Sequence, residues 1–289
     1  MKAINAVFSN VSEFIQFVPG ISANVELNQL NSSAISARKQ IRNIITFGLW
    51  DKVVKEKSSK TDAFYYLSTA FGNLIMHKAL IFDIVAKRLS GTADVYKHEL
   101  ETMRRQYIDN YYNAMDSLIE EFSSNNEYSE AWESTDEHKL LKELEIKDTA
   151  SFNSYYGIDM SYLFFHRTIP LQREILLDGM KEIIKKASSR DDLKDKLKLA
   201  LSQLVVALAL SRFDVIELPA TIRSLFDEQK TSRSGSDDQN RILTLASELR
   251  DDATSIISAV ELALSDHTNP NIVSETSFNR DDDKIYFIS

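Results

Sequence analysis

The chain of 289 residues contains no cysteine, and it has only 7 glycines and 4 prolines. Without cysteine there can be no disulfide bond, thiolate nucleophile or cysteine-ligated zinc, which fits a reducing compartment. The scarcity of glycine and proline argues against a turn-rich sheet protein, and the abundant Leu, Ile, Ala, Lys and Glu favour helices. A net charge of −9 argues against nonspecific nucleic-acid binding as the main function. We therefore expect an all-α protein whose main partner is not nucleic acid.

Motifs for catalysis and cofactor binding are also missing. The sequence has no GxxxxGK[ST], GxGxxG or GxSxG loop, and its helical carboxylates do not form the paired Glu and ExxH pattern of a di-iron bundle. The five histidines are His77, His98, His138, His166 and His267. They lack metal-binding spacing, and the acidic run from Asp281 to Asp283 lacks the glycine and terminal Glu of a calcium loop. We expect no catalytic residue, no cofactor and no metal site.

The clearest element of the sequence is the stretch from Asp191 to Phe213. Between Leu199 and Leu210 only Ser202 and Gln203 interrupt the apolar residues, so this helix should lie at the centre of a bundle. The stretch is too short, and too closely flanked by charged residues, to span a bilayer. The first residues of the chain include one lysine and no apolar run of signal-peptide length. We expect neither a membrane partner nor secretion by that route.

A second apolar stretch, from Thr61 to Phe82, matches the first without a gap at an offset of 130 residues. The matched positions are Val53 and Val54 with Ile183 and Ile184, Ser58 and Ser59 with Ser188 and Ser189, Asp62 with Asp192, and Leu67, Ala70, Leu74, Ala79 and Leu80 with Leu197, Ala200, Leu204, Ala209 and Leu210. The serines and the aspartate lie where one helix must end and the next begin. Chance similarity between helices would match leucine and alanine, but not the turn as well.

A third helix follows in each half of the chain, with identical steps between its apolar residues at an offset of 142. The two stripes are Leu100, Met103, Tyr107, Tyr111, Ala114, Leu118 and Phe122, and Ile242, Leu245, Leu249, Ala253, Ile256, Val260 and Leu264. The second half therefore has 12 additional residues, which fall within 214–240. Pro219 should break any helix there, and residues 231–240 should form an exposed loop. An insertion of this kind reflects either a contact with a partner or simple drift.

These patterns predict an internally duplicated helical bundle, built from two three-helix units related by a pseudo-twofold axis and flanked by extended terminal arms. The expected parts are an N-terminal arm (1–31), a first helical unit (32–123), a connector (124–166), a second helical unit (167–265) and an extended C-terminal tail (266–289). Ser32 and Ser33 should cap the first helix of the first unit, and Thr168 that of the second. Residues 155–166 alternate in a way that fits either a short strand or the start of a helix.

The two ends of the chain provide the candidate partner contacts. Asn10 should cap a short helix whose apolar residues Phe14 and Phe17 need to be covered. This helix either packs on its own bundle or forms an arm that reaches a neighbouring subunit. The tail ends in the apolar residues Ile285, Tyr286, Phe287 and Ile288. These four residues either dock on their own domain or add a strand to another subunit.

Asn73 and Gln203 occupy equivalent positions in the two most apolar helices. A buried amide without a partner costs about 1–3 kcal/mol, so each should hydrogen-bond to backbone or to the other near the pseudo-twofold axis. The alternative is that each lies at a helix edge and contacts water.

Two helix pairs carry a resemblance to a known family. They are "ARKQIRNIITFGLWDKVV" leading into "FYYLSTAFGNLIMHKAL", and "LQREILLDGMKEII" leading into "LKLALSQLVVALALSRF". The chain resembles the helical head–tail adaptor (connector) proteins of tailed phages, and proteins of similar length from Bacteroidales phages and prophages. The resemblance covers roughly half of the chain and transfers no catalytic residue. Such adaptors usually carry one unit per chain, so the duplication is a departure from the family.

The resemblance implies a non-enzymatic assembly protein that forms a ring beneath the portal. Its partners would be further copies of itself and other structural proteins, and it would occur in the bacterial cytoplasm and in the virion. An alternative is an intracellular helical-bundle module that binds another protein, and a third is an enzyme with an unrecognised site. A ring former should expose the apolar residues of arm and tail, a module should bury them, and an enzyme should have a deep polar pocket.

Overall fold

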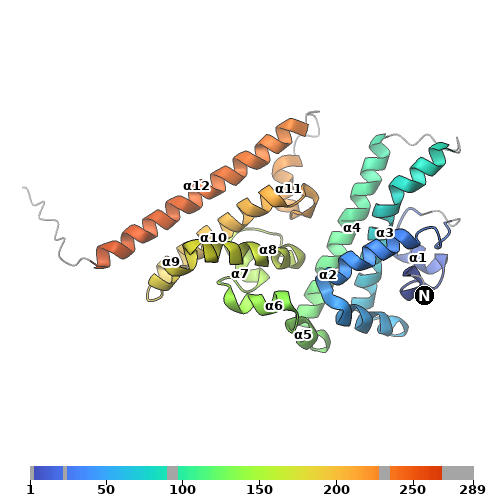
Figure 1. The fold of residues 1–289 in the computed structure, drawn as a ribbon, viewed down its shortest axis with the longest axis horizontal. Coiled ribbons are helices and arrows are strands. Elements are labelled where there is room, and N and C mark those ends of the chain that lie inside the picture. The colour runs from blue at the N-terminus through green and yellow to red at the C-terminus, as the bar shows by residue number, and fades with distance from the viewer. Residues whose placement is uncertain (1–2, 22–24, 90–96, 228–234, 269–289) are drawn as a thin grey trace, which may run out of the picture.

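A computed structural model of the chain describes residues 3–21, 25–89, 97–227 and 235–268 (Figure 1). Within these ranges every regular element is a helix, which confirms the all-α prediction. The helices are α1 (Val11–Phe17), α2 (Asn31–Lys55), α3 (Asp62–Leu89), α4 (Lys97–Ser124), α5 (Asn126–Glu133), α6 (Asp136–Leu140), α7 (Thr149–Tyr155), α8 (Tyr162–Ile175), α9 (Lys181–Lys186), α10 (Asp191–Arg212), α11 (Ala220–Asp227) and α12 (Gly235–Thr268). Short 3-10 turns lie at Ile4–Ala6, Glu56–Ser58, Leu141–Glu143 and Val215–Glu217, and a π-helical segment spans Leu176–Met180.

The buried apolar residues form two clusters, one in each half of the chain. The first cluster joins the N-terminal segment to α2, α3, α4 and α5, and its largest buried side chains include Trp50 and Phe71. The second joins α7, α8, α10, α11 and α12 around Leu197, Leu201 and Val205. The two clusters lie at opposite ends of the long axis of the molecule (Figure 1). We call them the first and second bundles.

The central helices α3 and α10 bury the apolar stripes predicted for them. Ala63, Leu67, Ala70 and Phe71 of α3 and Leu193, Leu197, Ala200 and Leu201 of α10 are all buried. α3 follows a 3-10 turn, and Thr61 caps it, because its hydroxyl oxygen accepts a hydrogen bond from Phe64 N (3.3 Å). Each central helix packs against the long helix that follows it, α4 or α12. These two helix pairs are the frame of the molecule.

The helix α2 differs from the prediction at its start and in its middle. It begins at Asn31, so Ser32 and Ser33 lie inside the helix and do not cap it. Thr46 has φ 71° and ψ 167°, which interrupts the helical period. After this interruption Phe47 and Gly48 are exposed, and Leu49 and Trp50 are buried.

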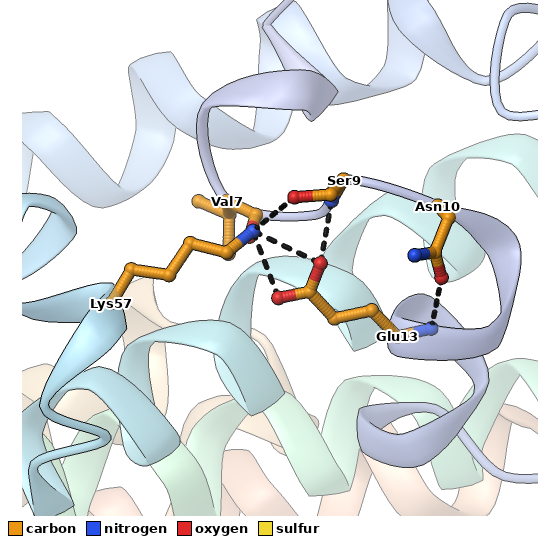
Figure 2. Close-up of polar contacts among 5 residues, drawn as sticks. All are labelled: Val7, Ser9, Asn10, Glu13 and Lys57. Atoms are coloured by element: carbon orange, nitrogen blue, oxygen red, sulfur yellow. Dashed lines mark hydrogen bonds and ion pairs between the residues drawn. The ribbon is translucent and has the colours of Figure 1, made fainter.

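The N-terminal segment packs on the first bundle. Asn10 caps α1 as predicted, since its side-chain oxygen accepts a hydrogen bond from Glu13 N (2.8 Å). Figure 2 shows how Lys57, from the turn before α3, fixes this segment. Its ammonium group donates hydrogen bonds to Val7 O (2.6 Å) and Ser9 Oγ (2.9 Å) and pairs with Glu13 Oε1 (2.8 Å). The described part of residues 1–31 is therefore part of the bundle.

The connector between the bundles is helical, so the strand alternative for residues 155–166 is wrong. α7 ends at Tyr155 and α8 begins at Tyr162. Ser161 caps α8, because its hydroxyl oxygen accepts a hydrogen bond from Phe164 N (3.2 Å). Thr168 was predicted to be the cap but lies inside α8, where its hydroxyl donates to Phe165 O (2.7 Å). The helix thus starts earlier than its proline at position 170 suggested.

The helix α12 is the longest in the described chain and is covered mainly on one side. Ala246, Leu249, Ala253 and Val260 are buried against α10. The loop predicted at 231–240 is wrong from Gly235 onward, where α12 has already begun. Residues 228–234 of that loop, and the tail residues Ile285, Tyr286, Phe287 and Ile288, lie outside the described residues.

Candidate functional site

A polar junction joins the two bundles, and Asp116 of α4 is at its centre. Asp116 Oδ1 accepts hydrogen bonds from Ser161 Oγ (2.8 Å) and from Leu163 N (2.8 Å) at the start of α8. Burial raises the pKa of Asp116, and the two hydrogen bonds oppose that shift. A carboxylate of the first bundle therefore binds the amino end of a helix of the second, where the helix dipole favours negative charge.

Glu217, in the 3-10 turn Val215–Glu217, is the second contact between the bundles. Its Oε1 accepts a hydrogen bond from Tyr112 Oη of α4 (3.0 Å) and pairs with Arg167 Nη1 of α8 (2.9 Å). Burial raises the pKa of Tyr112, and the nearby charge of Glu217 adds to the effect. The Tyr112 hydroxyl therefore keeps its proton at neutral pH and acts as a donor to the carboxylate.

The helix α11 provides the third contact. Arg223 Nη1 pairs with Asp109 Oδ1 of α4 (2.7 Å). At the start of α11, Thr221 donates to Asp159 from its backbone N (2.7 Å) and from its hydroxyl. Glu217 and Arg223, which bond to α4, both belong to the region 214–240. This region therefore joins the two bundles.

A small cavity of about 140 Å³ lies within this junction. Tyr112, Asp116, Glu217 and Arg223 line it, together with the apolar residues Leu163 and Phe164. Its charged groups bond to one another across the junction, so they are occupied in holding the bundles together. The cavity is far smaller than the 300–1,000 Å³ typical of ligand pockets. The junction is best explained as a structural joint.

A histidine pair next to the junction was not recognised in the sequence. His138 of α6 and His166 of α8 both lie beside Trp132 of α5, with ring centroids 6.4 Å and 4.9 Å from the indole. Burial lowers the pKa of His166 to about 4, and repulsion from His138 contributes. Burial also lowers the pKa of His138. The two histidines are 28 positions apart in the sequence, with no periodic pattern that links them. The packing of α5, α6 and α8 brings their side chains together.

A larger groove of about 540 Å³ lies on the second bundle between the end of α8, α10 and α12. Leu177, Leu204 and Leu208 give it an apolar wall, and Leu177 is 73% exposed. Glu174 at its rim pairs with Arg212 at 2.5 and 2.7 Å, and this hydrogen bonding lowers the pKa of Glu174. Leu177 lies in the π-helical segment, where Gly179 has a φ of 108° that favours glycine. The groove is open and apolar, and among its described lining residues no nucleophile lies beside a base.

Of the predicted partner contacts, the structure describes Phe14 and Phe17, and both pack on their own bundle, which is one of the two alternatives for the N-terminal helix. Phe14 is fully buried, with its ring 5.0 Å from that of Phe8. Phe17 is partly buried against Phe64 and Tyr65. Both side chains are therefore part of the first core.

Asn73 and Gln203 do not bond to each other. The Asn73 amide is buried and donates to Phe17 O (3.1 Å) and Thr69 O (2.8 Å), while its oxygen accepts from Asn110 Nδ2 (3.1 Å). The hydrogen bonds of Asn73 to backbone, one of the two alternatives, are therefore confirmed. Gln203 is only partly buried and lies in the second bundle. Its Oε1 atom is buried without a hydrogen-bond partner.

Neither a metal site nor a membrane span is found in the part of the chain that the structure describes. No three His, Cys, Asp or Glu side chains in these ranges are grouped so that they could hold a metal ion. None of the helices described there is long and apolar enough to cross a bilayer.

Comparisons with known proteins complete the description of the site. No protein-family model, no curated protein sequence and no solved structure matches this chain.

Proposed function

We propose that this protein is a non-enzymatic assembly protein that associates with further copies of itself. The observation that carries the proposal is the one-sided covering of α12. Its face opposite α10 exposes Leu243 and Leu262, which are 55% and 64% accessible. In the first bundle, Ile35 and Phe47 of α2 are similarly exposed, at 50% and 66%. Exposed apolar residues on both bundles are typical of a subunit that has more than one contact with its neighbours.

We further propose that the two bundles are duplicated copies of one unit. In support, the central helices bury equivalent residues at the offset of 130, including Leu67 with Leu197 and Ala70 with Ala200. The third helices do the same at the offset of 142, as in Leu118 with Val260.

The proposed setting is that of a head–tail connector, in which copies form a ring beneath a phage portal and contact other structural proteins. It rests on the resemblance of the helix pairs. Because Phe14 is buried, it is not available for contact with a neighbouring subunit. Its burial supports the alternative, a helical-bundle module that binds another intracellular protein. The exposed apolar residues of α2 and α12 favour assembly, because they lie on different bundles and a single small partner would not cover both.

The native mass of the full-length protein, measured by multi-angle light scattering over a wide range of concentrations, tests the proposal. We expect a species larger than a monomer whose population rises with concentration. The double variant Ile35→Glu, Leu262→Glu should remain monomeric, because each change places a charge on an apolar contact. A matched control is Tyr65→Glu, which alters a residue of α3 that is 55% exposed. A wild-type protein that stays monomeric at all concentrations, with or without residues 269–289, would favour the binding module.

A further inference from the structure

The two bundles share few apolar contacts. Each bundle has its own buried apolar cluster. Among the described residues of the second bundle, the apolar side chains that pack into the first cluster are Tyr162, Leu163 and Ile216. The other contacts across the junction include the polar bonds of Asp116, Glu217 and Arg223. Separating the bundles therefore exposes less apolar surface than unfolding either of them, and the junction should open before a bundle unfolds.

His166 lies between the two bundles, beside the polar junction. Its ring, on α8, is centred 4.9 Å from the ring of Trp132, which in turn lies 5.9 Å from the ring of Phe122 of α4. Trp132 and Phe122 both belong to the first cluster. His138 of α6 contacts the same indole, with ring centroids 6.4 Å apart. A proton on His166 is therefore enclosed between the bundles, next to a second histidine.

Among the described residues, no carboxylate acts on His166 to stabilise a proton there. The titratable group that acts on it is His138, and a charge on one histidine repels a charge on the other. Glu133 of α5 and Lys142, in the turn after α6, act on His138 with opposite effects. The other charged groups on the elements around α8 act on other residues: Asp116 and Glu120 of α4 on Tyr162, Glu143 on Arg173, Asp195 of α10 on Tyr155 of α7, Arg212 of α10 on Glu174, and Glu217 on Arg167.

We propose that the junction is an acid-sensitive hinge, at which protonation of His166 separates the two bundles while each bundle stays folded. When the bundles separate, the imidazole enters water and can hold a proton without the cost of burial. In the closed molecule burial lowers the pKa of His166 from 6.5 to about 4, so acid favours the open form. The inference concerns the shape of a single chain and does not depend on assembly.

The size of the effect follows from the pKa of His166 in the two forms. With a pKa of 6.5 when open and about 4 when closed, its protonation should raise the ratio of open to closed molecules about 20- to 30-fold between pH 7 and pH 5. His138 acts in the same direction, because burial lowers its pKa as well. Asp116 acts in the opposite direction, because burial raises its pKa and its protonation favours the closed form. A comparison of variants is therefore needed to isolate His166.

Hydrogen exchange of the full-length protein, read at single residues by mass spectrometry, tests the proposal. The Leu163 amide donates to Asp116 Oδ1 across the junction (2.8 Å), so it exchanges when the junction opens. Leu67 and Leu197 are fully buried in the two central helices, and their amides exchange when their bundle unfolds. After division by the intrinsic rate at each pH, exchange at Leu163 should rise at least about tenfold from pH 7 to pH 5. At pH 5 it should be at least about tenfold faster than at Leu67 and Leu197.

Two substitutions assign the pH dependence to His166. His166→Phe keeps the ring, and His166→Gln keeps a polar side chain, but neither takes up a proton in this range. In both variants the rise at Leu163 from pH 7 to pH 5 should be smaller than in the parent by the factor of about 20–30 given above. His138→Phe is the matched control and should keep most of the rise, since His138 is only partly buried.

Three results would overturn the hinge. Exchange at Leu163 that does not rise on acidification would show that acid does not open the junction. Equal exchange at Leu163, Leu67 and Leu197 at pH 5 would show that the bundles unfold together with the junction. An undiminished rise in both His166 variants would place the sensitivity to acid at another residue. The wild-type comparison of Leu163 with the two cores decides the question of opening even if a variant fails to fold.

Discussion

Acidification should lower the free energy of unfolding of this protein through one residue, the buried His166 beside the junction. His166 is 9% exposed and lies against Trp132, and burial lowers its pKa from 6.5 to about 4. A base whose pKa is lower in the folded than in the unfolded state binds its proton more weakly when folded. The folded state therefore loses stability as the pH falls below 6.5, until the folded pKa is reached.

The magnitude follows from the two pKa values. At pH 7 both states of His166 are largely neutral, and the contribution to the free energy of unfolding is close to zero. At pH 5 the unfolded imidazole is almost fully protonated, while the folded one is still mostly neutral. The free energy of unfolding should therefore be about 2 kcal/mol lower at pH 5 than at pH 7, a loss due to His166 alone. The effect should reach about 3 kcal/mol near pH 4.

The assay is urea unfolding followed by tryptophan fluorescence at pH 7, 6 and 5. Trp50→Phe serves as the background, because the chain has two tryptophans and Trp132 then reports on the junction alone. The effects of the many acidic residues are common to all variants and cancel when His166→Phe is compared with its parent. His138→Phe is the control and should remove less of the pH dependence, since that side chain is only partly buried. Equal pH slopes for His166→Phe and its parent would refute the reasoning.

Three other changes test the packing of the first bundle and the junction. Gly72→Ala should lower the free energy of unfolding by about 1–3 kcal/mol, because the added Cβ would collide with Val18. Gly48→Ala should raise the free energy of unfolding by up to about 1 kcal/mol, because the space around Gly48 is open. Urea unfolding of both variants measures the difference. Lys57→Met should expose the N-terminal segment to amide exchange at least about tenfold faster, because three hydrogen bonds are lost. Asp116→Ala should split one calorimetric transition into two, as it leaves two donors of α8 without their acceptor. An unchanged exchange rate in Lys57→Met, or a single calorimetric transition in Asp116→Ala, would contradict these two predictions.

The sequence predicted the frame of the fold because that frame depends on periodicity. The apolar stripes of α3, α4, α10 and α12 continue over many turns, and most of their described residues are buried or partly buried, although Met103 of α4 is 39% exposed. The errors arose where local geometry overrides the period. Thr46 adopts a backbone conformation that no propensity indicates for a β-branched residue, and the buried stripe of α2 changes register after it. Thr168 was taken for a cap because Pro170 follows it, although Ser161 had the same capping chemistry about two turns earlier.

The candidate site was less predictable, because it depends on pairs of residues that are far apart in the sequence. Asp116 and Ser161 are 45 residues apart, and Tyr112 and Glu217 are 105 apart. No local pattern marks either pair. The length difference between the two halves pointed to the region 214–240, but it did not reveal that Glu217 and Arg223 bind α4. The two alternatives for Phe14 stayed open for a related reason, since its burial depends on whether the N-terminal segment folds back onto α3.

The contact between the bundles bears on the proposed duplication. It joins α4, the last helix of the first proposed unit, to α8, the first helix of the second. Two units related by an exact twofold axis would instead contact each other through the same face of each. If the bundles are copies of one unit, as proposed above, they therefore follow each other head to tail and not about the pseudo-twofold axis that the sequence predicted.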